Sequence, residues 1–434
     1  MAKLPLEGVR VVEVCPIWAG PFACMLLADW GAEVIRVESR YHFPVYTRGV
    51  LARPPIQLAE QTPSGYAAYC LEGYDPQKAL NQFVLFNAHA RNKLGMTVDL
   101  RRPEGKDIFK RLVKVSDIVI ESQSPRVMEE LELTYDALKE VNPSLIMVSL
   151  PAFGQTGPYK YYRALGAHQE GFVGHTYLRG YADRDLSNNV TLYQTDETGG
   201  ATCAFAALMA LHKRRRTGEG MYVDMSQSEA TISILAQAVM DYTMNGRVTE
   251  RMGNRDYHGA IQGCYRCWGR DDWVCITINS EEEWDGFVRA LGEPQWAADD
   301  KFSDHVLRLK NHDELDRHIE AWTRQHEKYE VMHLLQAEGV PAGPVLDERD
   351  AYTDPHMRER GFFQELTQAD CGTHLYPGLP WRMNKTPNEV KRPPVRFGEH
   401  NEYVYKQVIG VSDEEYQFLE KEGHIGTHYI PEMF

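Results

Sequence analysis

The strongest constraint on the fold is an alternation of strand-like and helix-like runs over the first 150 residues. GVRVVEV, the breaker-rich turn PIWAGP, the helix-forming FACMLLADWG and AEVIRVE make one strand–helix–strand unit. A second round runs through TVDL, then PEGKDIFKRLVKV with Pro103 suited to a first helical turn, then SDIVIES, PRVMEELELTYDALKEV and SLIMVSL. Such alternation builds a mostly parallel sheet with helices on both faces, so the sequence predicts a Rossmann-like α/β layer.

A long connection, from about Tyr41 to Asn92, separates the two rounds. It contains Arg53-Pro54-Pro55, several glycines and the tyrosines Tyr46, Tyr66, Tyr69 and Tyr74. A connection of this length without regular structure is uncommon inside a compact domain. Two interpretations stay open: a lid or binding loop, and a surface insertion that packs on itself.

The second half of the chain changes character near Gly253. Before it, ETGGATCAFAALMALHKRRR favours a helix, and SEATISILAQAVMDYTMNG predicts a long apolar-rich helix suited to linking domains. After it, GCYRCWGRDDWVCITI predicts a hairpin, with helical segments up to Gly339. Near the C-terminus, Ser412 and Glu415 have the spacing of a helix N-cap. A smaller domain therefore begins near Gly253.

Composition excludes several classes of function. The 434 residues include 47 Lys+Arg and 62 Asp+Glu, and the net charge of −15 argues against a sequence-independent nucleic-acid binder. No window approaches the roughly 18 to 20 apolar residues that span a bilayer, and the start MAKLPLEGVRVVEV lacks the pattern of a signal peptide. We expect a cytoplasmic protein with no membrane or nucleic-acid partner, and its eight cysteines as reduced thiols.

Metal and nucleotide motifs are incomplete. Cys264 and Cys267 have metal-site spacing, but no second pair follows, and residues three apart on a strand face opposite sides, so we interpret them as packing groups. We interpret His168 and His175 as structural groups, and Lys213–Arg216 as a solvated helix end. GxGxxG after the first strand and GxxxxGK[ST] are both missing, which counts against nicotinamide and nucleoside-triphosphate enzymes. We expect no metal site.

Asp196 is the acidic residue whose surroundings in the sequence best fit a catalytic role. It lies in QTDETGG, immediately before the Ala-rich helix. It is either an N-cap whose carboxylate accepts a backbone N–H, or a carboxylate nucleophile at a helix start, where two glycines let a ligand approach. The residues alone do not separate these interpretations.

Four segments in order resemble the class III coenzyme A-transferases, the family that includes formyl-CoA and carnitine-CoA transferases. They are PLEGVRVVEVCPIWAGPFACMLLADWGAEVIRVES, FNAHARNKLGMTVDLRRPEGKDIF, LMALHKRRRTGEGMYVDMSQSEA and GVPAGPVL, and the resemblance runs from Leu4 to about Gly410. It implies a large Rossmann-like CoA-binding domain from residues 1–225 and 346–434, a linker helix over 226–252 and a small α+β domain over 253–345. It also implies ring-shaped chains that interlock into a dimer, of one chain type or two.

The resemblance implies that Asp196 is the catalytic residue. Its carboxylate would carry CoA from an acyl-CoA donor to an acceptor acid as an aspartyl-CoA thioester, with acyl-CoA as substrate and no tightly bound cofactor. Positions that match CoA-binding residues of the family are Ile17, Trp18, Ala19, Val98 and Arg163, with Arg40 next to a further one.

Three departures from the family pattern bear on specificity. Trp18 replaces a glutamine that closes over intermediates in the formyl-CoA enzyme, Ser39 stands at a phosphate-binding arginine position with Arg40 adjacent, and Glu130 stands at another arginine position. The glycine lid of that enzyme is also missing, which argues against formyl/oxalate specificity. We hypothesise that Trp18 and the Tyr-bearing insertion shape an apolar pocket for a bulky or aromatic acid.

Two alternatives stay open beside the transferase. Related α-methylacyl-CoA racemases pair the same aspartate with a histidine, but that position is Leu165 here, and epimerisation needs acid–base groups on both faces of the substrate carbon. A non-catalytic subunit that binds CoA, or only completes a heterodimer, is the second alternative, because the arginine positions are changed.

Overall fold

The computed structural model describes residues 4–61, 68–256, 258–387 and 389–433, which divide into two compact units. The chain passes between the units after Gly174, after Val190, within α12 (Ala236–Asn245) and within α18 (Pro355–Glu359). The domain limits given above stay a prediction. The first unit comprises Met1–Gly174, Thr191–Gln237 and Arg358–Phe434, and the second comprises His175–Val190 and Ala238–Met357.

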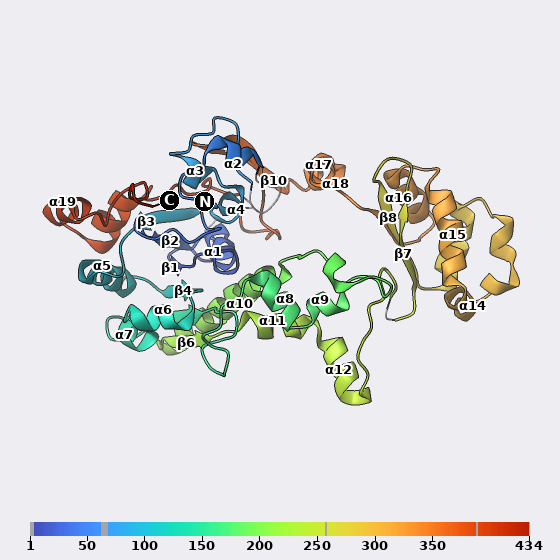
Figure 1. The fold of residues 1–434 in the computed structure, drawn as a ribbon, viewed down its shortest axis with the longest axis horizontal. Helices are drawn as coiled ribbons and strands as arrows, with labels where there is room; N and C mark the ends of the chain where they lie inside the picture. Colours follow the sequence, from blue (N-terminus) through green and yellow to red (C-terminus); the bar gives the residue numbers. More distant parts are fainter. Residues whose placement is uncertain (1–3, 62–67, 257, 388, 434) are drawn as a thin grey trace. The chain divides into compact units, whose positions relative to one another are not determined.

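A six-stranded parallel sheet forms the centre of the first unit (Figure 1). Its order is β3-β2-β1-β4-β5-β6, so the winding direction reverses between β1 and β4. In such sheets ligands bind outside the carboxyl ends of the strands, at this reversal. The predicted α/β class is confirmed. The strands are β1 (Arg10–Val14), β2 (Glu33–Glu38), β3 (Lys93–Thr97), β4 (Ile118–Glu121), β5 (Ile146–Ser149) and β6 (Met221–Asp224).

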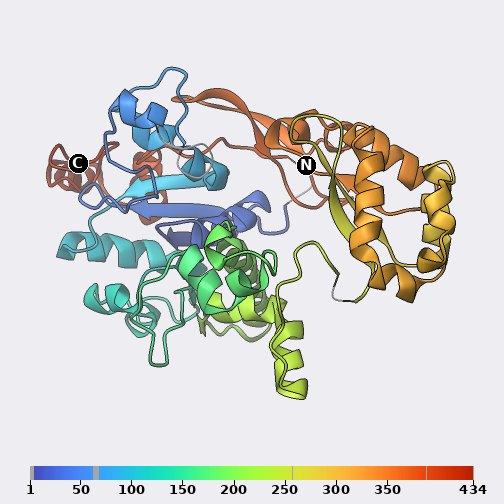
Figure 2. The same ribbon diagram turned by 45° about the vertical axis from the view of Figure 1, so that its right-hand side comes forward.

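Helices cover both faces of this sheet, because successive strand residues point to opposite sides. Val11 belongs to the core that α1 and α10 form on one face, while Val12 belongs to the core that α5, α7, α19 and a π-helix form on the other. Figures 1 and 2 show these helices around the sheet. The bounds are α1 (Ala19–Asp29), α10 (Gln194–Thr217), α5 (Pro103–Lys114), α7 (Tyr135–Lys139), the π-helix (Tyr403–Ile409) and α19 (Asp413–Lys421). Pro103 at the start of α5 and the Ser412 cap of α19 are as predicted.

The connection after β2 contributes to an apolar cluster separate from the two cores that flank the sheet. Its described part contains three short helices, and Phe83 and Tyr69 pack with Trp18 and Val395. This favours the self-packing interpretation for the described part; Tyr66 lies outside the described residues. The remaining elements of this unit are α2 (Ile56–Gln61), α3 (Ala79–Gln82), α4 (Val84–His89), α6 (Pro125–Glu130), α8 (Gly166–Phe172), α11 (Gln227–Ile234), β10 (Phe363–Gln368) and β11 (Gly372–Pro377).

The second unit has a three-stranded antiparallel sheet of order β7-β8-β9 with its own apolar core. The predicted hairpin is confirmed as β7 and β8. Its strands and helices are β7 (Ile261–Arg266), β8 (Trp273–Ile278), β9 (Ala342–Pro344), α9 (His175–Leu178), α13 (Glu281–Ala290), α14 (His305–Lys310), α15 (His312–Thr323), α16 (Lys328–Ala337) and α17 (Glu348–Thr353). No helix among the described residues is long and apolar enough to cross a membrane.

Two predicted elements are corrected. The strand predicted at TVDL starts earlier, at Lys93, because the Lys93 charge is neutralised inside the sheet by Glu13. The linker helix predicted over residues 226–252 is two helices, α11 and α12, separated at Leu235. Three of the last four residues of α11, Thr231, Ile232 and Ile234, are β-branched and have low helix propensity.

Candidate active site

Asp196 lies in the first turn of α10, not at its N-cap. The N-cap is Tyr193, whose φ of 56° is left-handed, and the backbone N–H of Asp196 donates to the Tyr193 carbonyl at 3.0 Å. The N-cap interpretation of Asp196 was therefore wrong. Because the helix starts earlier than the sequence suggested, the Asp196 side chain is not occupied by capping and stays available for other chemistry.

The Asp196 carboxylate is shielded from water, and none of the described residues places a cation beside it. The residue is 8% exposed, and among the described residues no side chain forms a hydrogen bond or ion pair with its carboxylate. Burial raises the pKa of Asp196 to about 7, and the negative charges of Glu197 and Glu170 add to this rise. The carboxylate is therefore poised between its acid and ionised forms near neutral pH.

Two residues of α8 shape the environment of Asp196. A Cβ atom on Gly166 would clash with the Asp196 Oδ2 atom, so only glycine lets α8 approach the carboxylate this closely. Fully buried Glu170 accepts the backbone N–H of Gln194 at 2.8 Å and that of Leu192 at 3.3 Å. Glu170 thus holds the left-handed turn before α10. Sequence reasoning assigned Glu170 no role.

The turn that begins α1 lies against the start of α10. Trp18 Nε1 donates to Glu197 Oε1 at 3.4 Å, and the Trp18 ring stacks on Tyr193 with centroids 4.9 Å apart. Trp18 itself has φ 44° and ψ −82°, a strained conformation that its packing maintains. Gly200 completes the contact, since a Cβ atom there would clash with the Ala19 carbonyl oxygen.

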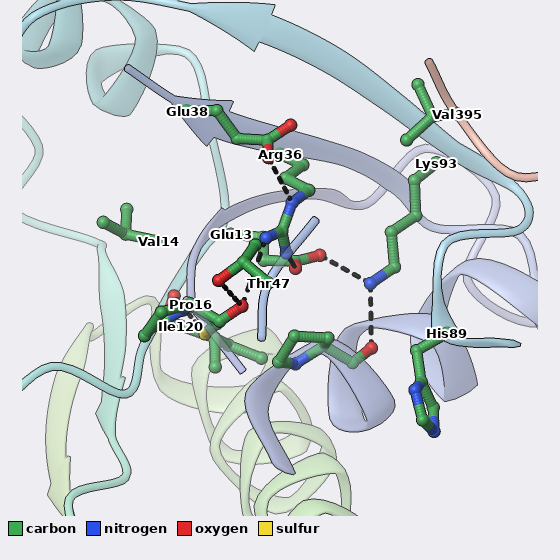
Figure 3. Close-up of polar contacts among 12 residues, drawn as sticks. Glu13, Val14, Pro16, Arg36, Glu38, Thr47, His89, Lys93, Ile120 and Val395 are labelled. Carbon is green, nitrogen blue, oxygen red and sulfur yellow. Dashed lines mark hydrogen bonds and ion pairs between the residues drawn. The ribbon is translucent and has the colours of Figure 1, made fainter. Parts of the chain in front are cut away.

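A buried network of charges lies beneath this turn (Figure 3). Glu13 of β1 pairs with Arg36 of β2 and, at 2.7 Å, with Lys93 of β3. Arg36 Nε also lies 3.4 Å from Glu38 Oε1, and Arg48 binds both Glu38 oxygens at 2.7 Å. Each buried charge therefore has an opposite charge in contact, as burial requires.

The network reaches the backbone of the turn on both sides of Trp18. The Pro16 carbonyl accepts from Thr47 Oγ1 at 2.8 Å and from Arg36 at 3.4 Å, and Lys93 Nζ donates to the Pro21 carbonyl at 2.8 Å (Figure 3). Sequence reasoning assigned these side chains no role. The available signal was one cation in each of two strands, Arg36 in EVIRVE and Lys93 in KLGMT.

A cavity of about 420 Å³ opens at the carboxyl ends of β1 to β4, at the reversal point of the sheet. Val14, Glu38 and Val98 line it at the strand ends, and Pro16 connects it to the turn that contacts α10. Its other lining residues include the polar side chains Ser39, His42, Arg101, Lys106, Gln123 and Glu130. The cavity is large enough for part of a nucleotide-sized ligand.

The cavity brings together only some of the predicted CoA-binding residues. Val98 lines it, and Ile17, Trp18 and Ala19 form the adjoining turn. Arg40 is not in its lining: its guanidinium donates to the carbonyls of His428, Gly423 and Ile425 in the C-terminal segment. Arg163 is exposed.

Arg101 and Lys106 are the cations at the rim of the cavity that sequence reasoning missed. Arg101 pairs with Asp99 at 2.9 Å, and its side chain is 59% exposed, while Lys106 pairs with Glu132 at 2.6 Å. Each pair has one solvent-exposed member, Arg101 in the first and Glu132 in the second, so both cations lie at the surface end of the cavity. The cations of the segment RRPEGK, residues 101–106, were the sequence signal that could have indicated these two residues.

The position of the racemase histidine offers no acid–base group. Leu165 is 48% exposed, and the nearby His168 uses Nδ1 to accept the Leu165 N–H at 3.1 Å. No group of three or more potential metal ligands occurs within the described ranges. The acidic groups at the start of α10 are Asp196 and the two glutamates whose charges act on it, Glu170 and Glu197.

The comparisons with known proteins agree with this geometry. The family model of CoA-transferase family III matches residues 6–401. A succinyl-CoA–D-citramalate CoA-transferase of Chloroflexus aurantiacus is 30% identical over 416 residues, which cover 96% of this chain and 97% of the relative. The beta subunit of a succinyl-CoA–L-malate CoA-transferase of the same species is 27% identical over 413 residues, 95% of this chain and 96% of the subunit.

A solved structure has the same fold. A CAIB/BAIF family protein from Brucella suis superposes with a TM-score of 0.79 at 27% identity, covering 94% of this chain and 100% of that one. The resemblance described from the sequence motifs is thereby confirmed over nearly the whole chain. The chain belongs to CoA-transferase family III and is a CoA-transferase.

Proposed function

We propose that this chain transfers CoA from an acyl-CoA donor to an acceptor carboxylic acid, with Asp196 as the nucleophile. The observation that carries the proposal is the state of its carboxylate: shielded, without an ion-pair partner, and next to the turn that borders the cavity. A carboxylate in a structural salt bridge would be a poor nucleophile. Burial and the negative charges of Glu197 and Glu170 raise the pKa of Asp196 and therefore its basicity.

The chemistry exchanges one thioester for another. The Asp196 carboxylate attacks the donor thioester carbonyl and the C–S bond breaks. This step forms a mixed anhydride between Asp196 and the donor acid and releases CoA thiolate. The thiolate then attacks the aspartyl carbonyl, which releases the donor acid and forms an aspartyl-CoA thioester. The acceptor carboxylate reverses both steps and leaves as its CoA thioester. Shielding from water protects the anhydride, which hydrolysis would otherwise destroy.

Mass spectrometry of the protein after exposure to succinyl-CoA alone tests this proposal, since the related transferases named above act on succinyl-CoA. We expect CoA attached to the peptide that contains Asp196, and no adduct on the Asp196→Ala protein. Transfer to a panel of carboxylic acids should fall by at least about a thousandfold in that variant. Wild-type turnover by Asp196→Ala would exclude the mechanism.

We propose that the adenosine end of CoA occupies the cavity at the strand ends. Val98 offers an apolar contact there, and Arg101 and Lys106 are the cations nearest the rim. The pantetheine arm would then follow the Pro16–Trp18 turn towards α10. Arg101→Ala and Lys106→Ala should each raise KM for acyl-CoA about tenfold with little change in kcat.

We propose that the active form is an interlocked dimer. Phe205, Leu208 and Met209 are 64%, 40% and 53% exposed on α10, the helix that carries Asp196. Apolar side chains gathered on one exposed helix face mark an interaction surface. A second copy of this chain is the partner we propose. A partner of different sequence is the alternative, since one relative is a subunit of a heteromeric enzyme.

A further inference from the structure

Two cysteines face each other across the sheet of the second unit. Cys264 of β7 lies directly opposite Cys275 of the antiparallel strand β8. Cys267 is buried in the core on the other face of the sheet, as the spacing of three residues predicted. The close sulfur partner of Cys264 therefore comes from the next strand and not from its own.

The pattern of backbone hydrogen bonds in the hairpin brings these two side chains close. At the turn, the Cys267 N–H donates to the Asp272 carbonyl at 2.8 Å, which marks a hydrogen-bonded pair. Bonded and non-bonded pairs alternate along antiparallel strands, so Cys264 and Cys275 form a non-hydrogen-bonded pair. The Cα atoms of such pairs lie about 4.5 Å apart, and disulfides span about 4.4 to 6.8 Å.

The hydrogen bonds on the other side of β8, to β9, lead to the same assignment. The Val345 N–H donates to the Trp273 carbonyl at 2.9 Å and the Thr277 N–H to the Pro341 carbonyl at 3.0 Å, so the odd-numbered residues of β8 direct their backbone groups to the β9 side. Cys275 belongs to this set and pairs there with Gly343, which has no side chain to cover the thiol. The Cys275 side chain is accordingly exposed, while that of Cys264 is partly buried.

The two thiols differ in reactivity. Burial, together with the adjacent Cys275, raises the pKa of Cys264 to about 12. Cys264 therefore stays protonated, and the exposed Cys275 is the sulfur that meets reagents from solvent first. All eight cysteines are free thiols in the structure, so the pair is in its reduced state.

We propose that Cys264 and Cys275 are a reversible modification site, a dithiol that a low-molecular-weight disulfide oxidises to an intrachain disulfide. With glutathione disulfide, the Cys275 thiolate attacks one sulfur, the S–S bond breaks, and one glutathione thiolate leaves. The Cys264 thiol then loses its proton to solvent and attacks the Cys275 sulfur, which releases the second glutathione. Two protein thiols are oxidised and one glutathione disulfide is reduced to two thiols.

Peptide mapping of the full-length protein after incubation with glutathione disulfide tests this site. Trypsin cuts after Arg266 and Arg270, between the two cysteines, so a disulfide links two otherwise separate peptides. We expect the linked pair, two hydrogens lighter than the sum of its parts, to disappear after reduction with dithiothreitol. Cys264→Ser is the matched variant: without the second thiol, Cys275 should accumulate the mixed disulfide with glutathione.

The mixed disulfide distinguishes the outcomes. If the wild-type protein accumulates it on Cys275 as fully as Cys264→Ser and yields no linked peptides, the proposal is wrong. The same holds if neither cysteine reacts while other cysteines do. Cys275→Ser is the second variant, and it should show neither the link nor the adduct. The site does not depend on the proposed role of Asp196, because the readout is covalent mass and not CoA transfer.

Discussion

At the scale of single residues, the reactivity of Asp196 depends on its ionisation. Its pKa is raised to about 7 by burial and by two neighbouring carboxylates, and only the ionised form is a nucleophile. We therefore predict that kcat/KM for CoA transfer rises with pH up to about 7 and levels off above it. Initial rates from about pH 5 to about pH 9 measure this profile. A rate that is flat across neutral pH would contradict the assigned pKa.

The Glu170→Gln variant locates the source of this shift. Removing one negative charge should move the midpoint of the profile to lower pH, while the amide oxygen can still accept from the Gln194 N–H. An unchanged midpoint would mean that Glu170 acts through the backbone alone.

Gly166 is the second residue whose identity the site fixes. In Gly166→Ala the new methyl group would displace the Asp196 carboxylate, so we predict at least about a tenfold loss of kcat with the fold retained. Gly171→Ala in the same helix is the matched control, since its Cβ position has open space around it. Equal activity of the two variants, measured with succinyl-CoA, would show that Asp196 tolerates the displacement.

At the scale of elements, side chains outside the Pro16–Trp18 turn hold it in place. Thr47→Val removes the 2.8 Å hydrogen bond to the Pro16 carbonyl at nearly constant volume. We predict a rise of a few-fold in KM for acyl-CoA, with about 1 kcal/mol of stability lost. Thr353→Val is the control, because its exposed hydroxyl also bonds a backbone carbonyl but lies outside the site. Steady-state kinetics and thermal unfolding separate the two effects.

At the scale of the whole molecule, the exposed apolar face of α10 bears on the oligomeric state of the protein. We predict that the wild-type chain elutes as a dimer and that Phe205→Glu shifts it towards monomer, because a buried unpaired charge costs several kcal/mol. Light scattering after size exclusion measures the mass. Lys213→Glu, at the solvated end of the same helix, is a control for charge alone. A wild-type monomer with full activity would exclude the dimer.

Much of the secondary structure in both units was predictable because each signal is local. Apolar runs separated by turn residues gave the α/β class, and the cap at Ser412 and the hairpin over residues 261–278 followed from short patterns. Asp196 was located by its motif. The start of α10 was placed too late, however, because Tyr193 adopts a left-handed conformation that Glu170 imposes from another helix.

The sequence by itself determined the order of strands and helices, the family and the acidic residue on which the proposed chemistry depends. Only the tertiary structure decided that Asp196 is shielded and unpaired, that Arg40 binds carbonyls of the C-terminal segment, and that Cys264 faces Cys275. The physical reason is the distance along the chain over which each property is set. Secondary structure follows from neighbours along the chain, whereas burial, pKa and thiol pairing depend on groups that meet only when distant segments pack together.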